Sequence, residues 1–189
     1  MSKLSLPSIL AATAGYLFTY WNSRINKERE AQIDRINEQL RDLYGPLLAC
    51  VSATQHAFNA MVRQHTPDGS RDEFVRAVND HPDGIEGIAY RQWIKEVLQP
   101  LNQRASEAIT QRADLLESSM MEPLLLQLVA HVSAFKVILR RWEEGHVAER
   151  SAIPYPDKVV DYAEQEFRKM KTRQAELLGI SNGRIRSKL

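Results

Sequence analysis

Apolar and small side chains recur along residues 33–61 at steps of three and four positions, which is the spacing of one face of an α-helix. Charged residues occupy many of the positions between them. Such a helix is not stable alone in water, so other helices of the chain must cover its apolar face. The residues of this predicted helix seam are Ile33, Ile36, Leu40, Leu43, Leu47, Cys50, Thr54, Ala57 and Met61.

The same periodicity continues through most of the chain. It predicts a long helix over residues 23–65 that either kinks at Pro46 or ends near Tyr44 and is followed by a new helix with Pro46 in its first turn; the apolar stripe continues on both sides and favours the kink. A second long helix is predicted over 85–116, and Pro100 should bend it. Capping boxes at Ser70 and Ser119 predict helix starts, and Gly145 and Gly179 predict helix ends. Further helices are expected over residues 70–79, 124–142 and 157–177, with an extended linker over 146–156.

No stretch alternates apolar and polar residues over a length that would indicate a β-strand. The sequence therefore predicts an all-α fold, with a single N-terminal transmembrane helix followed by an antiparallel bundle of about four main helices. The expected parts are a membrane anchor over residues 1–22, a helical bundle domain over 23–179 and a basic tail over 180–189.

The predicted anchor is the uncharged run of residues 4–21. As a helix it would be about 27 Å long, just short of the roughly 30 Å hydrocarbon core of a bilayer. Tyr16, Tyr20 and Trp21 gather at one end, where aromatic rings favour the membrane interface. Three alternatives remain open for this run, namely a signal peptide cleaved after Ala14, a mitochondrial presequence and an ordinary buried helix.

Basic residues flank the predicted anchor unequally. Lys3 stands alone on one side, and Arg24, Lys27, Arg29 and Arg35 follow on the other. The positive-inside rule therefore predicts that the C-terminal domain lies on the cytoplasmic side of its membrane, whether this is an organelle membrane or a bacterial inner membrane.

Small residues form a stripe along the predicted anchor, at the same three-four spacing as the helix seam. Small side chains allow two membrane helices to approach closely, so the stripe predicts a face for a parallel homodimer. Small residues are common in membrane helices in any case, and a monomer remains the alternative. The residues of this predicted dimerisation face are Ser8, Ala12, Gly15 and Thr19.

Composition and chemistry exclude more functions than they indicate. The net charge of +1 lacks the basic excess that nucleic-acid binding normally requires. The single cysteine, Cys50, cannot form an internal disulfide. No catalytic constellation, cofactor motif or set of metal ligands is evident. The nearest is Glu143 with His146, which matches one Glu-x-x-His element of di-iron bundles but has no second copy.

The final tripeptide, Ser187-Lys188-Leu189, has the form of a peroxisomal import signal. That signal normally directs soluble cargo, so it competes with the predicted membrane anchor. A basic tail that contacts an anionic membrane surface is the simpler interpretation.

The run Gln-Leu-Arg-Asp-Leu-Tyr-Gly-Pro-Leu-Leu, residues 39–48, resembles the juxtamembrane segment of a loose set of N-terminally anchored, single-pass helical proteins. These proteins resemble the chain in a short N-terminal span, then charged residues, then a Leu-Tyr-Gly-Pro-Leu core. The resemblance covers the first third of the chain and implies no activity.

These observations favour a non-enzymatic, membrane-anchored helical protein that scaffolds, tethers or assembles a protein partner. Two alternatives stay open. One is an all-α metal-binding protein or enzyme with Glu143 and His146 as ligands, and the other is soluble peroxisomal cargo.

Overall fold

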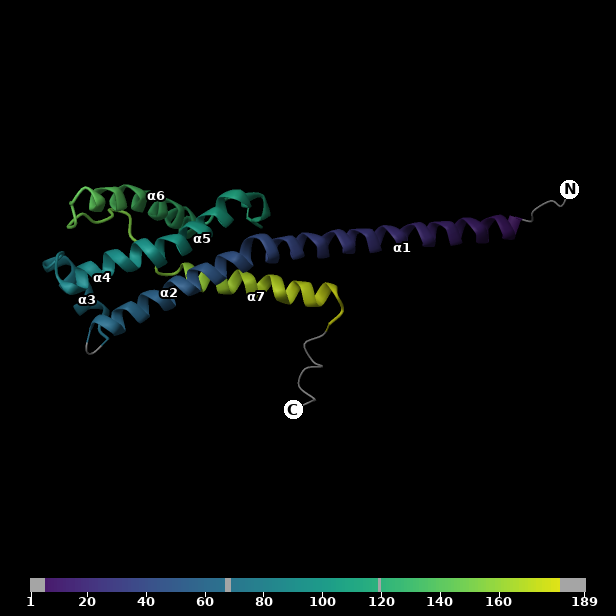
Figure 1. Ribbon diagram of the computed structural model, residues 1–189. Helices are drawn as coiled ribbons and strands as arrows, with labels where there is room; N and C mark the ends of the chain where they lie inside the picture. The colour runs from purple at the N-terminus through teal and green to yellow at the C-terminus, as the bar shows by residue number, and fades with distance from the viewer. Residues whose placement is uncertain (1–5, 67–68, 119, 181–189) are drawn as a thin grey trace, which may run out of the picture. The chain divides into compact units, whose positions relative to one another are not determined.

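The computed structural model describes residues 6–66, 69–118 and 120–180, with side chains described from residue 15 onward. Every regular element in these ranges is helical and none is a strand, so the all-α prediction is confirmed (Figure 1). The elements are α1 (Leu6–Glu38), the π-helical turn η1 (Gln39–Tyr44), α2 (Gly45–His65), α3 (Arg71–Asp80), α4 (Ile85–Trp93), the π-helical turn η2 (Ile94–Leu98), α5 (Gln99–Gln111), the 3₁₀ turn η3 (Ala113–Leu115), α6 (Pro123–Glu143) and α7 (Val159–Leu177).

The chain divides into two compact units. The first comprises the described parts of residues 1–37 and 171–189, and the second comprises residues 38–170. In the first unit, the Arg29 guanidinium donates a 2.6 Å hydrogen bond from Nε to the Leu177 carbonyl, and Gln174 donates a 2.6 Å bond to Asn37. A cation at the last carbonyls of α7 interacts favourably with the negative end of the helix dipole.

The second unit is a helical bundle. Within it, α5 lies between α2 and α6 and packs against both, and these helices run in alternating directions (Figure 1). Helix α4 packs against α2 and α3. The helical bundle of the prediction is therefore confirmed for residues 38–170, with short helices added to the main ones.

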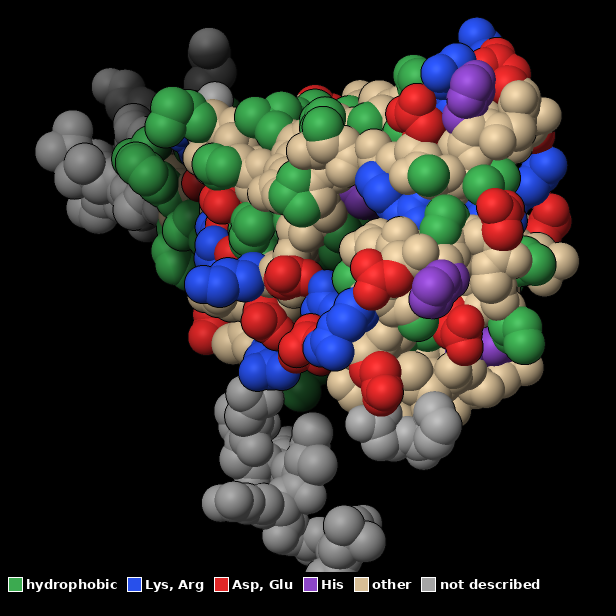
Figure 2. Space-filling view, turned by 90° about the vertical axis from the view of Figure 1, so that its left-hand side faces the viewer, with side chains coloured by type: hydrophobic (Ala, Val, Ile, Leu, Met, Phe, Trp, Pro, Cys, Tyr) green, Lys and Arg blue, Asp and Glu red, His purple; other side chains and the backbone are tan. Residues whose placement is uncertain are grey.

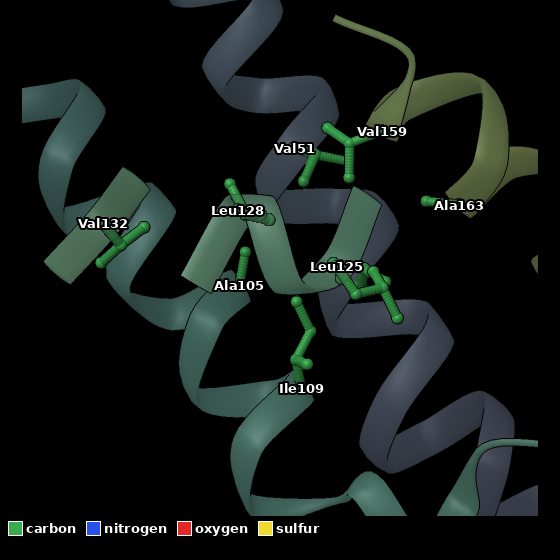
Figure 3. Close-up of a cluster of buried hydrophobic side chains, with 9 residues drawn as sticks. Val51, Ala105, Ile109, Leu125, Leu128, Val132, Val159 and Ala163 are labelled. Carbon is green, nitrogen blue, oxygen red and sulfur yellow. The ribbon is translucent and has the colours of Figure 1, made fainter. Parts of the chain in front are cut away.

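Two groups of buried side chains form the core of the bundle. In the first, side chains from α2, α5, α6 and the start of α7 meet, and Leu47, Val51 and Ala105 are fully buried (Figure 3). The second lies among α2, α3, η2 and α6 and contains Met61, Phe74, Leu98, Phe135 and Trp142 with their neighbours. The apolar face of each helix is thereby removed from water, which is the main stabilising contribution.

At Pro46 and Pro100, where the sequence predicts irregular helix, a π-helical turn precedes each proline. The residue before each proline donates its N–H to the carbonyl five positions back, Gly45 to Leu40 and Gln99 to Ile94. Each proline then lies in the first turn of the next α-helix. Proline has no N–H to donate. Each proline therefore lies where the backbone hydrogen bonds of the helix change from a spacing of five residues to a spacing of four.

The buried face of α2 agrees in part with the predicted seam. Ile36 before the π turn, Leu43 within it and Leu47 after it are buried, as expected. Further along α2, the seam residues Thr54 and Met61 are buried as well, whereas Cys50 and Ala57 are only half-buried. Val51 and Val62, which lie beside the predicted stripe, are also buried.

Several predicted helix boundaries are confirmed. Ser70 caps α3 by accepting a 3.3 Å hydrogen bond from the Glu73 N–H. Gly145, with φ of 91°, ends α6, and the His146 N–H bonds to the Arg141 carbonyl in the pattern of a Schellman motif.

Two other boundaries differ from the prediction. The helix predicted over residues 85–116 ends at Gln111, and Leu115 is buried in the following 3₁₀ turn, where its carbonyl accepts a 2.7 Å hydrogen bond from Gln39. Helix α6 begins at Pro123 with Glu122 as its N-cap, so it does not start at a Ser119 capping box.

Gly45→Ala should destabilise the bundle, because a Cβ atom at this position would overlap the Leu40 carbonyl oxygen, which is backbone and cannot move independently. We expect a loss of about 1–3 kcal/mol in the free energy of unfolding, as for other overpacked sites. Urea denaturation followed by circular dichroism measures it. Gly15→Ala is the matched control, since nothing lies within 4 Å of a Cβ there. Equal stability of the two variants would contradict this and show that the chain accommodates a Cβ atom at position 45 without cost.

Candidate functional site

The bundle unit contains a cavity of about 440 Å³. This volume falls within the roughly 300–1,000 Å³ range of small-molecule sites, which are usually lined by apolar and aromatic side chains with a few polar groups. Its walls come from α2, α3, α4, η2, α5 and α6, from residues 150–157, and from Val160 of α7. The apolar lining includes Phe58, Phe74, Val78, Tyr90, Ile94, Leu98 and Phe135.

The linker between α6 and α7 supplies one wall of this cavity. Hydrogen bonds attach it to the helices: the Trp142 Nε1–H donates to the Glu149 carbonyl at 2.9 Å, and Arg150 Nη2 donates to the Val78 carbonyl at 2.7 Å. Pro154 and Pro156 keep the residues before them out of helical conformation. The linker predicted over residues 146–156 is thus non-helical and forms part of a site.

Polar side chains on α2 and α5 meet in the cavity wall. The Thr54 hydroxyl donates a 3.0 Å hydrogen bond to Asn102 Oδ1, and both side chains are almost completely buried. Burying a hydroxyl or an amide costs free energy unless the group is hydrogen-bonded, so the bond between Thr54 and Asn102 offsets part of the cost of burying both.

His131 of α6 is a third polar group in the wall. Its Nδ1 lies 2.7 Å from the Ile153 carbonyl oxygen. Because a carbonyl only accepts, Nδ1 carries the proton, and Nε2 of the neutral ring is an acceptor. Burial lowers the pKa of His131, which keeps the imidazole neutral near pH 7. Its ring packs on Phe135 and meets Tyr155 edge to face, with centroids 4.7 and 5.5 Å apart.

Tyr155 carries a buried hydroxyl that has no hydrogen-bond partner among the residues the structure describes. Burial raises the pKa of this phenol above its ordinary value, so it stays protonated and remains a donor. Orphaned buried hydroxyls are uncommon and call for an explanation, such as a bound molecule.

Charged groups of the cavity lining are engaged with their own chain. Arg71 lies over the Phe58 ring at 5.4 Å and pairs with Asp157 at 3.4 Å. Arg150 donates to the Val78 and Val147 carbonyls and to Asn79, and burial lowers its pKa. Elsewhere on the face in Figure 2, Lys and Arg alternate with Asp and Glu, without a large basic patch.

A second feature is the N-terminal part of α1. All residues from 15 to 32 are exposed, including the large apolar side chains of Tyr16, Leu17, Phe18, Tyr20 and Trp21. Successive residues of a helix differ by about 100° in direction, so Tyr16, Leu17 and Phe18 spread over more than half of the circumference, and Gly15 and Thr19 lie on the remaining side. So wide an exposed apolar surface is normally covered by protein or by a membrane.

Within the described ranges, one helix, α6, is long and apolar enough to cross a membrane by length and composition. Leu125, Leu128 and Val132 of α6 belong to the bundle core, which is an ordinary reason for such composition. The predicted N-terminal span, residues 4–21, lies partly outside the described residues and is not confirmed.

The predicted dimerisation face is described only in part. The side chains of Ser8 and Ala12 lie outside the described residues. Gly15 is open to its surroundings, and the Thr19 hydroxyl donates a 2.9 Å hydrogen bond to the Gly15 carbonyl.

Along the predicted helix seam, Ile36, Leu43 and Leu47 are buried within the chain, and Ile33 and Leu40 are half-buried.

The residues considered for metal binding are not brought together. Glu143 forms a 2.9 Å ion pair with Lys95, and His146 lies beyond the end of α6 and is exposed. In the described part of the chain, no group of three or more His, Cys, Asp and Glu side chains could hold an ion.

The C-terminal tripeptide that has the form of a peroxisomal signal, Ser187, Lys188 and Leu189, lies outside the described residues.

Sequence reasoning missed the cavity, although a signal for it exists. Asn102 falls on the apolar stripe of its helix between Leu98 and Ala105, and His131 falls between Leu128 and Phe135. Polar side chains on a buried stripe must find partners. The convergence of two such residues from different helices with the linker is decided only by tertiary packing.

Comparison with protein-family models, with curated proteins and with solved structures finds no match to this chain.

His131 should make stability depend on pH. Its pKa is lower in the folded protein than in the unfolded chain, where it is about 6.5. Below that pH the unfolded state binds the proton first, so the free energy of unfolding should fall as pH decreases from 7 to 5. Urea denaturation at several pH values measures this, and His131→Gln should remove part of the fall. His56→Gln, at an exposed position, is the control and should keep the wild-type profile. Identical profiles for wild type and His131→Gln would contradict the assignment.

Proposed function

We propose that this protein is a membrane-anchored, non-catalytic helical protein whose bundle scaffolds, tethers or helps to assemble a partner. The observation that carries the proposal is the row of large apolar side chains exposed around α1, above all Tyr16, Leu17, Phe18 and Trp21. Water around so much apolar surface is unfavourable, and a bilayer is a solvent that would remove it.

The flanking sequence supports insertion of the uncharged run of residues 4–21 rather than of α6. Aromatic residues at its end are followed at once by Arg24, Lys27 and Arg29, which is the order found at a membrane interface. Helix α6, by contrast, contributes fully buried Leu125 and Leu128 to the bundle core, and inserting it would expose that core.

The basic residues also give an orientation. With one Lys before the run and several Arg and Lys after it, the bundle would lie on the cytoplasmic side of the membrane. A stable helical bundle held at that surface fits a scaffold or tether, because binding surfaces on rigid elements keep a partner in a defined place.

Charges placed in the proposed span should release the protein from membranes. Leu10→Arg with Leu17→Arg adds two charges, and each costs up to about 3 kcal/mol near the centre of a span. We expect wild-type protein in the pellet after carbonate extraction and a large part of this variant in the supernatant.

The matched control is Leu126→Arg with Val137→Arg, two exposed apolar positions on α6. This variant should stay in the pellet. Release of the α6 variant with retention of the α1 variant would make α6 the span, and release of wild type would end the anchor proposal.

We further propose that α1 pairs with a second copy in the membrane through its small-residue face. The open surroundings of Gly15 favour this, because a second backbone can come close only where no side chain intervenes. Leu43 and Leu47 have no exposed surface left for a partner, so pairing would be confined to residues before Ile36.

Disulfide cross-linking tests the pairing in membranes, in a Cys50→Ala background. Gly15→Cys should give a cross-linked dimer, whereas Leu17→Cys, about 200° away around the helix, should not. Gly15→Ile should weaken the dimer, since a branched side chain separates the backbones. Equal cross-linking at both positions would indicate random collision, and no cross-link at either would indicate a monomer.

A further inference from the structure

We infer that the cavity of the bundle is a binding site for an uncharged lipophilic alcohol or phenol. The inference concerns residues 54–160 and is independent of the anchor proposed above. It rests on three polar groups in the cavity lining that have unused hydrogen-bonding capacity, set among aromatic and aliphatic walls.

Asn102 provides unused donors. Its Oδ1 accepts from Thr54, but its two amide N–H groups donate to no residue in the described part of the chain, although the side chain is only 4% exposed. An amide whose donors have no partner in the chain can donate to a ligand oxygen in the cavity.

His131 and Tyr155 complete the set. The Nδ1–H of His131 is occupied by the Ile153 carbonyl, which leaves Nε2 as an acceptor to which no described residue donates. The Tyr155 hydroxyl is buried without a partner and is a donor. The two rings meet edge to face with centroids 5.5 Å apart, and both residues line the cavity.

The hydrogen-bonding pattern determines the functional group. Donors on Asn102 and Tyr155 and an acceptor on His131 are groups that an alcohol can satisfy, because a hydroxyl both accepts and donates. Thr54, Asn102, His131 and Tyr155 are uncharged, so a ligand charge beside them would be unpaired. Arg150 offers no ready counter-charge, because chain carbonyls and Asn79 already hold its guanidinium.

The rest of the ligand is apolar. Phe58, Phe74, Tyr90 and Phe135 line the cavity together with Ile94 and Leu98 of the π turn η2. Aromatic walls favour flat rings, which stack against them or meet their edges. A fused-ring alcohol therefore represents the proposed class.

Three compounds of one shape test the inference: 9-fluorenol, which donates and accepts, 9-fluorenone, which only accepts, and fluorene, which does neither. Binding of each compound to the intact protein in detergent is measured by calorimetry, and each affinity is calculated from the concentration of free ligand. Fluorenol should bind most tightly and fluorene least, with about twofold to tenfold for each hydrogen bond gained.

Two sets of variants locate the binding. Val75→Trp adds a large ring at an exposed position of the cavity lining and should weaken binding, whereas Val137→Trp, at an exposed valine outside the lining, should not. Thr54→Val with Asn102→Leu replaces both partners of a hydrogen bond by apolar groups of similar shape, which preserves the fold. It should weaken fluorenol and fluorenone about twofold to tenfold and leave fluorene unchanged.

Equal affinity of the three compounds for wild type would overturn the proposed ligand class. Unchanged binding to Val75→Trp would overturn the site. If 9-fluorenecarboxylate bound more tightly than fluorenol, the ligand would instead be an anion, and the inference would also fail.

Discussion

The bundle depends on the burial of one apolar face of α2 by α5 and α6. Leu47 and Val51 from α2, Ala105 and Ile109 from α5, and Leu125 from α6 have no exposed surface. The small Ala105 lets the middle helix approach the others, and burial of these side chains supplies the main stabilisation. Helix α3, the 3₁₀ turn and the linker are then attached to this arrangement by secondary contacts and hydrogen bonds.

Two prolines impose a second constraint, and the chain meets it in the same way each time. A π turn precedes Pro46 and another precedes Pro100. Beside these turns lie two buried glutamines, and each donates to a carbonyl of another element, Gln39 to Leu115 at 2.7 Å and Gln99 to Val132 at 3.0 Å. Each π turn is thus accompanied by a side-chain hydrogen bond to another element. The second π turn also lines the cavity, as π turns frequently do at functional sites.

The two proposed functional features differ in how they use apolar surface. Near the N-terminal end of α1, large apolar side chains are exposed over a wide face and require an external apolar phase or partner. In the bundle, apolar side chains enclose a cavity in which Asn102, His131 and Tyr155 retain unused hydrogen bonds. The proposed role of α1 depends only on the length and composition of one helix. The cavity depends on several elements being packed together.

The sequence by itself determined the all-α class, most helix positions and several helix ends, because periodicity, Ser70 and Gly145 act within one or two turns of chain. It also marked Pro46 and Pro100 as irregular. Only the tertiary structure decided that these irregularities are π turns and that Val51 is fully buried while Cys50 is only half-buried, because the depth to which a side chain is buried depends on the elements packed against its helix. The cavity was decided in the same way, because Thr54, Asn102, His131 and Tyr155 lie far apart in the chain and only helix packing brings them to one place.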